Sequence, residues 1–117
     1  MKQGEIWLVD LNPTMGAEMK KIRPALIINA NAFGKLPLKI IVPVTEWQNR
    51  YAAIPWMLQV KPDGANGLNK LSSIDCFQIR CVAQERLLKK MGNVTVDEVE
   101  QAIDKITKII GFNYFNV

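Results

Sequence analysis

The chain has 117 residues, nearly half of them apolar, and a formal net charge of +4. This length and composition predict one folded domain over residues 1–117, with its own core, and exclude a disordered chain. No apolar run approaches the roughly 20 residues of a membrane-spanning helix, and no leader pattern precedes the first strand, so we expect a cytoplasmic protein without a membrane partner.

The positive charge belongs to the N-terminal part of the chain. Residues 1–94 contain 13 Lys and Arg against 7 Asp and Glu, whereas residues 95–117 contain two lysines against four acids. This distribution favours a polyanionic or acidic partner. The chain has no histidine, which excludes Ser-His-Asp and Cys-His catalytic sites. Two cysteines, Cys76 and Cys81, are too few for a zinc site, and we expect no metal and no cofactor.

Three strands are predicted in the first 44 residues. Residues 5–11 carry apolar side chains on both faces, which is typical of a strand buried on both sides in a small barrel. After a polar loop, a second strand begins at Arg23 and runs to about Ala30. A third strand covers residues 38–44.

A short helix and a half-exposed strand are predicted next. Thr45 and Gln48 have the spacing of a capping box, with Thr45 as N-cap of a helix that runs to about Ala53. Residues 56–60 alternate between apolar and polar, which predicts an antiparallel strand.

Residues 71–85 are predicted to hold the last β segment. The apolar side chains change parity near residues 76–77, which indicates a bulge. Beyond the bulge, Phe77, Ile79 and Cys81 are expected to face inward, and Gln78 and Arg80 outward.

The only long helix is predicted at the C-terminal end. Thr95 and Glu98 form a second capping box, an apolar stripe follows at helical spacing, and Gly111 is the expected C-cap. An aromatic tail follows at residues 112–115. The stripe consists of Val99, Ala102, Ile103, Ile106, Ile109 and Ile110. Short strands and one terminal helix predict a mainly β (α+β) fold, a small twisted barrel with a C-terminal helix.

Polar side chains at strand ends offer a site for phosphate chemistry. If the first three strands are neighbours, Arg23 and Thr45 face each other across a groove. The arginine fork suits a phosphate, and a threonine hydroxyl can donate to a phosphoryl oxygen. Each group also has a plainer interpretation: Thr45 as a helix cap, and Glu18 as a solvated loop acid.

Arg80 is also open to a plainer interpretation, because Asp75 or Glu85 could pair with it.

Four blocks of the sequence resemble the MazF/PemK family of bacterial toxins, in order and over essentially the whole chain. They are Gly4–Thr14, Gly16-Ala17-Glu18 with Ile22–Ile28, Ile41–Thr45, and Gln78-Ile79-Arg80 with Glu85-Arg86-Leu87. The resemblance implies an SH3-like barrel of the CcdB/PemK type with a C-terminal helix.

The resemblance also implies a homodimeric, metal-independent endoribonuclease that cuts single-stranded RNA, typically mRNA, at a short sequence and so inhibits translation and growth. The ribose 2′-hydroxyl attacks the adjacent phosphorus, which leaves a 2′,3′-cyclic phosphate and a 5′-hydroxyl. The partner is a cognate antitoxin whose acidic C-terminal segment fills the RNA groove.

By position, Arg23 and Thr45 match the catalytic pair of MazF-like members, and Glu18 matches a loop acid implicated in activity. Because arginine stays protonated, we assign Arg23 to charge stabilisation and leave the base open between Glu18 and an RNA-bound water. Gln78 and Arg80 match positions near bound RNA. The expected RNA-binding residues are Lys20, Lys21, Gln48, Gln78 and Arg80.

The sequence departs from the family pattern in its loop and last β block. Where some PemK-type members have a histidine, an arginine and an aspartate, this chain has Ala17, Asp75 and Phe77. Two other functions stay open: a non-catalytic toxin of the same fold that binds a protein such as DNA gyrase, or a degenerate member that only binds RNA or antitoxin. The absence of any Trp beyond Trp56 counts against gyrase.

Overall fold

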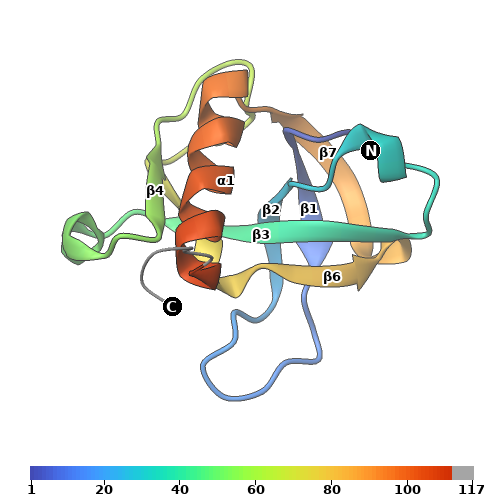
Figure 1. Ribbon diagram of the computed structural model, residues 1–117, viewed down its shortest axis with the longest axis horizontal. Helices are drawn as coiled ribbons and strands as arrows, with labels where there is room; N and C mark the ends of the chain where they lie inside the picture. Colours follow the sequence, from blue (N-terminus) through green and yellow to red (C-terminus); the bar gives the residue numbers. More distant parts are fainter. Residues whose placement is uncertain (112–117) are drawn as a thin grey trace.

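The computed structural model describes residues 1–111; the aromatic tail predicted at residues 112–115 lies outside this range. Within it the chain forms seven strands and one α-helix (Figure 1). The strands are β1 (Glu5–Asp10), β2 (Ile22–Ile27), β3 (Leu38–Glu46), β4 (Met57–Val60), β5 (Ser72–Asp75), β6 (Arg80–Ala83) and β7 (Leu87–Asn93), and the helix is α1 (Val96–Ile110). Four 3₁₀ helices lie between them: η1 (Asn31–Phe33), η2 (Asn49–Ala53), η3 (Cys76–Gln78) and η4 (Gln84–Arg86). The predicted mainly β fold with a C-terminal helix is confirmed.

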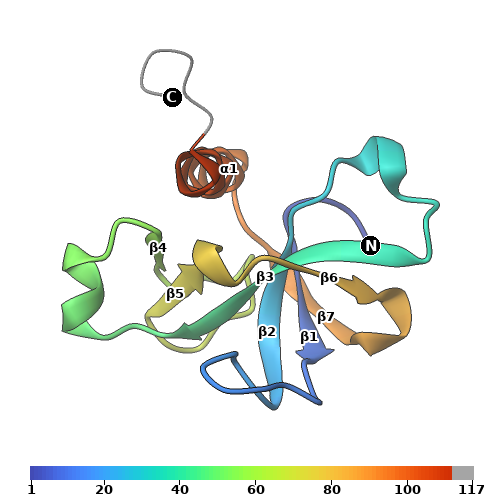
Figure 2. The same ribbon diagram turned by 60° about the horizontal axis from the view of Figure 1, so that its bottom comes forward.

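All strand pairings are antiparallel, in the order β4-β5-β3-β2-β1-β7, with β6 also paired to β3. The long strand β3 organises this sheet. One edge of it pairs with β2, and the other pairs first with β6 and then with β5. Figure 2 shows the consequence: β4 and β5 diverge to one side of β3, and β6 and β7 to the other.

Two apolar clusters fill the two faces of this sheet. The first lies under α1 and consists of Ile6, Leu26, Ile28, Val42, Val44, Leu58, Val60, Leu68, Ile74, Cys76, Val99 and Ala102. The second consists of Val9, Leu11, Ala25, Ile27, Ile41, Val82 and Leu87. Because β1 contributes Ile6 to one cluster and Val9 to the other, the prediction of a first strand buried on both faces is confirmed.

The predicted caps of α1 are also confirmed. The Thr95 hydroxyl accepts from the Glu98 backbone amide at 3.1 Å, and the Glu98 carboxylate accepts from the Thr95 backbone amide at 2.9 Å. At the other end of the helix, Gly111 is the C-cap and has φ 73°. Along the predicted stripe, Ile103 and Ile110 are 41% and 73% exposed, so those two residues do not belong to the core. No helix within residues 1–111 is long and apolar enough to cross a membrane.

The predicted last β segment is wrong in two respects. Residues 71–85 do not form one bulged strand, because η3 separates β5 from β6. The break lies beside Pro43, which has no N–H to donate to a neighbouring strand. In addition, β7 follows and pairs with β1, although its sequence shows no alternation.

The expected side-chain directions around η3 are reversed by this break. Phe77, Ile79 and Cys81 are exposed, whereas Gln78 and Arg80 are half-buried. The side chains of Gln78 and Arg80 therefore point toward the segment between β1 and β2 and not outward into solvent.

Candidate active site

The structure brings Arg23 and Thr45 together, as predicted. Strands β2 and β3 pair Ala25 with Pro43, and two residues further along each strand stand Arg23 and Thr45 on the same face of the sheet. Arg23 Nη1 donates to Thr45 Oγ1 at 3.3 Å. The arginine Nε donates to the Lys20 carbonyl at 2.9 Å. Two contacts on different sides therefore fix the plane of the guanidinium.

Thr45 does not cap a helix, so the predicted capping box at residues 45–48 is wrong. Strand β3 continues through Glu46, and η2 begins only at Asn49, where Gln48 precedes it without a side-chain cap. Pairing with β5 explains the difference, because Thr45 lies opposite Ser73 and this strand contact prevails over the local helix signal. The hydroxyl is thereby left to face Arg23.

A hollow of about 310 Å³ opens beside Arg23 and Thr45. Its charged side chains are Arg23, Glu46 and Lys70, of which the last two form an exposed ion pair at 3.8 Å. Within residues 1–111 no acceptor is bonded to Arg23 Nη2, so this edge of the fork can donate to an anion. The remaining lining residues are Pro24, Val44, Leu68, Asn69, Ser72 and Met91.

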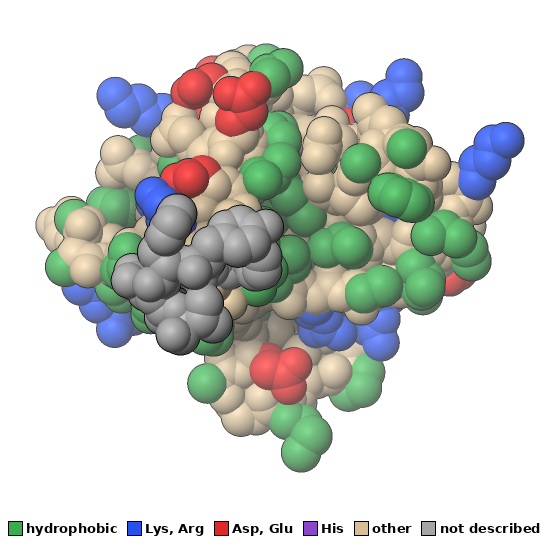
Figure 3. Space-filling view, viewed as in Figure 1, with side chains coloured by type: hydrophobic (Ala, Val, Ile, Leu, Met, Phe, Trp, Pro, Cys, Tyr) green, Lys and Arg blue, Asp and Glu red, His purple; other side chains and the backbone are tan. Residues whose placement is uncertain are grey.

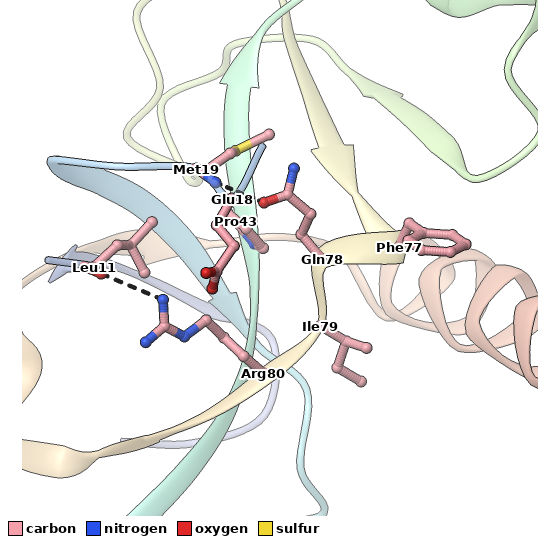
Figure 4. Close-up of a pocket in the computed structure, with 8 residues that line it drawn as sticks. All are labelled: Leu11, Glu18, Met19, Pro43, Phe77, Gln78, Ile79 and Arg80. Atoms are coloured by element: carbon pink, nitrogen blue, oxygen red, sulfur yellow. Dashed lines mark hydrogen bonds between the residues drawn. The ribbon is translucent and has the colours of Figure 1, made fainter. Parts of the chain in front are cut away.

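Glu18 lies in a second hollow, of about 240 Å³, together with Gln78 and Arg80 (Figure 4). Its carboxylate accepts from the Met15 amide at 2.9 Å, which closes a turn within the loop. Glu18 is not among the residues that line the hollow beside Arg23. The sequence-predicted residues thus form two groups, joined through the segment that runs from Glu18 to Arg23.

Gln78 and Arg80 hold the backbone of the loop between β1 and β2 at two points rather than pointing into solvent. The Met19 amide donates to Gln78 Oε1 at 2.7 Å, and Arg80 Nη1 donates to the Leu11 carbonyl at 3.3 Å (Figure 4). The partner of Arg80 is therefore neither of the two acids that the sequence offered.

The other expected RNA-binding residues, Lys20, Lys21 and Gln48, are exposed and line neither hollow. Lys21 has φ 73°, a left-handed conformation that is uncommon for a residue with a side chain. Its amide donates to Asn12 Oδ1 at 3.1 Å, which holds the end of the loop against its start.

Asp75 is a buried acid that sequence reasoning did not assign to the site. It is 5% exposed, and burial raises the pKa of its carboxyl, although hydrogen bonds from Phe77 and Gln78 act in the opposite direction. The available signal was weak: an Asp at the end of a segment of buried serines. Within residues 1–111, no group of three or more Cys, Asp or Glu side chains could hold a metal ion.

Comparison with known proteins places this geometry in context. Residues 2–110 match the family described as PemK-like, MazF-like toxin of type II toxin–antitoxin system. The chain is 34% identical over 113 residues to the endoribonuclease MazF9 of Mycobacterium tuberculosis, covering 93% of this chain and 94% of that protein. It is 33% identical over 104 residues to the endoribonuclease PemK of Escherichia coli, covering 88% and 73%.

Solved structures share the fold. A crystal structure of MazF from Deinococcus radiodurans superposes with a TM-score of 0.78 at 19% identity, covering 96% of this chain and 97% of the other. A mycobacterial endoribonuclease in complex with its cognate antitoxin superposes with a TM-score of 0.76 at 17% identity, covering 97% and 98%.

Proposed function

The chain belongs to the PemK-like, MazF-like toxins of type II toxin–antitoxin systems and is an endoribonuclease, and we propose that it cuts single-stranded RNA, chiefly mRNA, at a short sequence and without a metal ion. Such cleavage inhibits translation and growth. The family membership implied by the sequence blocks is confirmed. The observation that carries the proposed chemistry is the arginine fork held by Thr45 and Lys20 with one edge free.

In the proposed reaction the ribose 2′-hydroxyl attacks the adjacent phosphorus. A bond forms between the 2′-oxygen and phosphorus, and the bond from phosphorus to the 5′-oxygen breaks. The products are a 2′,3′-cyclic phosphate and a 5′-hydroxyl, which receives a proton. Arg23 stabilises the charge that develops on the phosphoryl oxygens.

The Thr45 hydroxyl accepts from Arg23 and can at the same time donate its own hydrogen to a phosphoryl oxygen. Arg23 does not act as the base, because a guanidinium keeps its proton. Glu18 is the carboxylate that the loop between β1 and β2 offers, and either it or a water bound to RNA receives the proton of the 2′-hydroxyl.

RNA is held by Lys20, Lys21 and Gln48 on the exposed rim, and by Gln78 and Arg80 in the second hollow. The proposal is supported by the surplus of positive charge in residues 1–94, which attracts a polyanion. The surface that binds RNA also accommodates the acidic C-terminal segment of a cognate antitoxin. The toxin acts in the cytoplasm.

A second copy of the chain is the proposed partner of an apolar surface on the outer side of β3, β6 and η1. Side chains of this kind gather over these elements in Figure 3. The surface has a hollow of about 200 Å³ lined by Asn29, Phe33, Leu36, Leu38, Ile40 and Cys81, none of which is charged. RNA and an acidic antitoxin segment are both anionic, so an uncharged surface suits a second copy better.

Incubation of the purified protein with a long single-stranded RNA in EDTA tests the function. We expect defined cleavage products whose upstream fragments end in a cyclic phosphate by mass spectrometry. An absence of cleavage across varied RNA sequences would refute the nuclease, and activity that disappears in EDTA would refute the metal-free reaction.

A further inference from the structure

Asp75 occupies a position that the proposed reaction does not use. It ends β5 and precedes η3, with both carboxylate oxygens engaged. Oδ1 accepts from the Phe77 amide at 3.2 Å, and Oδ2 accepts from Gln78 Nε2 at 3.2 Å. Because both contacts come from donors, they favour the ionised carboxylate as the acceptor.

The Gln78 side-chain amide links Asp75 to the loop between β1 and β2. The Met19 amide can only donate, so Gln78 presents Oε1 to it, at 2.7 Å. The Nε2 group of the same amide is then directed to Asp75. Gln78 and Met19 also line two neighbouring hollows, of about 240 and 330 Å³, and form part of the wall between them.

The next residue along the loop contacts the catalytic arginine. Met19 is followed by Lys20, whose carbonyl accepts from Arg23 Nε at 2.9 Å, and Nη1 of the same guanidinium contacts Thr45. Hydrogen bonds, joined by the covalent backbone of Met19 and Lys20, therefore connect the buried carboxylate to the arginine.

We propose that Asp75 and Gln78 are positioning residues for RNA cleavage: together they form a latch that holds the backbone of Met19 and Lys20, and through it the plane of the Arg23 guanidinium. The proposal rests on the proposed nuclease function. Other hydrogen bonds hold the loop at its base, through Leu11, Asn12 and Lys21. The latch ties the Met19 amide to Gln78 of η3 and to Asp75 at the end of β5, whereas the Met19 side chain packs on the second apolar cluster.

The isosteric variant Asp75→Asn tests the latch. An asparagine offers one acceptor and one donor, so in either orientation an N–H faces the donor of Phe77 or of Gln78. We expect the cleavage rate to fall by roughly 10- to 100-fold, the scale of a misplaced catalytic group. Hydrogen exchange of the Met19 amide should accelerate by about 10-fold or more.

Asp63→Asn is the matched control. Asp63 is likewise an acid with two donors, the backbone amides of Ala65 and Asn66, both at Oδ1, but it lies in a turn outside the site. Its loss should leave cleavage and Met19 exchange unchanged. Wild-type cleavage or unchanged Met19 exchange in Asp75→Asn would overturn the proposal.

Gln78→Glu separates positioning from a general structural role. With one proton shared between the two acids, the introduced carboxyl can donate its hydroxyl to Asp75 while its carbonyl accepts from Met19, so the latch is intact at lower pH. When that proton is lost, two carboxylates face each other and the latch opens. The other titratable or charged groups around it are Arg50 and Tyr51 of η2 in one hollow, Glu18 and Arg80 in the other, and Cys76, which adjoins Asp75.

The single-turnover cleavage rate of Gln78→Glu at saturating RNA, divided by that of the wild type, should therefore fall by about 10-fold or more between about pH 6 and 9. A ratio that is independent of pH would overturn the latch. If the wild-type protein does not cut RNA, the proposed function fails, but Met19 exchange in Asp75→Asn still tests the latch itself.

Discussion

At the scale of single residues, the chemistry depends on how Arg23 is held. Its guanidinium meets Thr45 on one side and the Lys20 carbonyl on another. Arg23→Ala should lower the single-turnover cleavage rate by roughly 10²–10³-fold, since one preorganised donor to the developing charge is lost. Arg23→Lys is the informative companion, because it keeps the charge without the planar fork and should rescue only part of the rate. Wild-type turnover in the alanine variant would remove Arg23 from the site.

Thr45→Val tests the hydroxyl apart from the fold. Valine has nearly the same shape and suits a β-strand, so thermal stability should change little, whereas the cleavage rate should fall by about 10-fold or more. Thr45→Ser keeps the hydroxyl and should keep most of the activity. A loss of about 1 kcal/mol of unfolding free energy with unchanged cleavage is the signature of a helix cap, and it would contradict the assignment.

The pair of Arg23 and Thr45 was predictable because local signals determine it. Pro24 indicates an extended Arg23 at a strand start, and the antiparallel pairing of the consecutive strands β2 and β3 brings it opposite Thr45. The bond from Met19 to Gln78 joins residues 59 positions apart, and no pattern near either residue indicates it. Positioning residues of this kind require the structure.

At the scale of elements, local signals in the sequence predict α1 but not β7. The caps of α1 are local, and its predicted boundaries at Thr95 and Gly111 agree with the structure. Strand β7 contains two lysines and a glycine and owes its existence to pairing with β1. Thr45 illustrates the opposite error, in which a capping pattern is overruled by the contact between β3 and β5.

Glu5 links the start of β1 to β7 and makes the sheet sensitive to acid. Burial acts to raise the pKa of its carboxyl, but hydrogen bonds from the Trp7 indole, the Lys2 amide and Lys90 lower that pKa to about 2. The folded-state pKa thus lies below the unfolded value of about 4.3, so this stabilisation is present at neutral pH and is lost as the pH falls from about 4 towards 2.

Glu5→Gln should therefore lower the free energy of unfolding at pH 7 by on the order of 2 kcal/mol, and the difference from wild type should shrink towards pH 2. Urea unfolding at a series of pH values measures it. Glu46→Gln is the control, because its ion pair with Lys70 is exposed and contributes little. A difference that stays constant with pH would show that the Glu5 charge is not the cause.

At the scale of the whole molecule, the positive charge governs the affinity for RNA. Binding of a single strand weakens with salt by a slope of about 0.7 in log–log form for each phosphate neutralised. Replacing Lys20 and Lys21 with glutamine should reduce this slope by about 1.4, measured with an RNA that lacks the 2′-hydroxyl at the cleavage position. Lys2→Gln should leave the slope unchanged, because Lys2 precedes the start of β1 whereas the loop follows its end. An unaltered slope in the double variant would place both lysines outside the RNA contact.

The apolar surface is the feature of the whole molecule that bears on dimer formation. The apolar surface over β3, β6 and η1 includes Phe33, Leu36 and Leu38 at 62%, 52% and 48% exposure, and an isolated protein gains nothing from keeping such side chains in water. The buried Lys39 keeps the surface in shape, because its ammonium donates to the carbonyls of Gly34, Leu36 and Leu38.

If a second copy covers this surface, a charge placed within it should separate the copies, because each carboxylate would be buried against an apolar partner. Leu38→Glu should therefore sediment as a monomer at concentrations where the wild-type protein is a dimer. Leu88→Glu, an exposed leucine of β7 at 53%, should remain a dimer. A wild-type protein that sediments as a monomer, or a dimer that persists in Leu38→Glu, would exclude this surface as the interface.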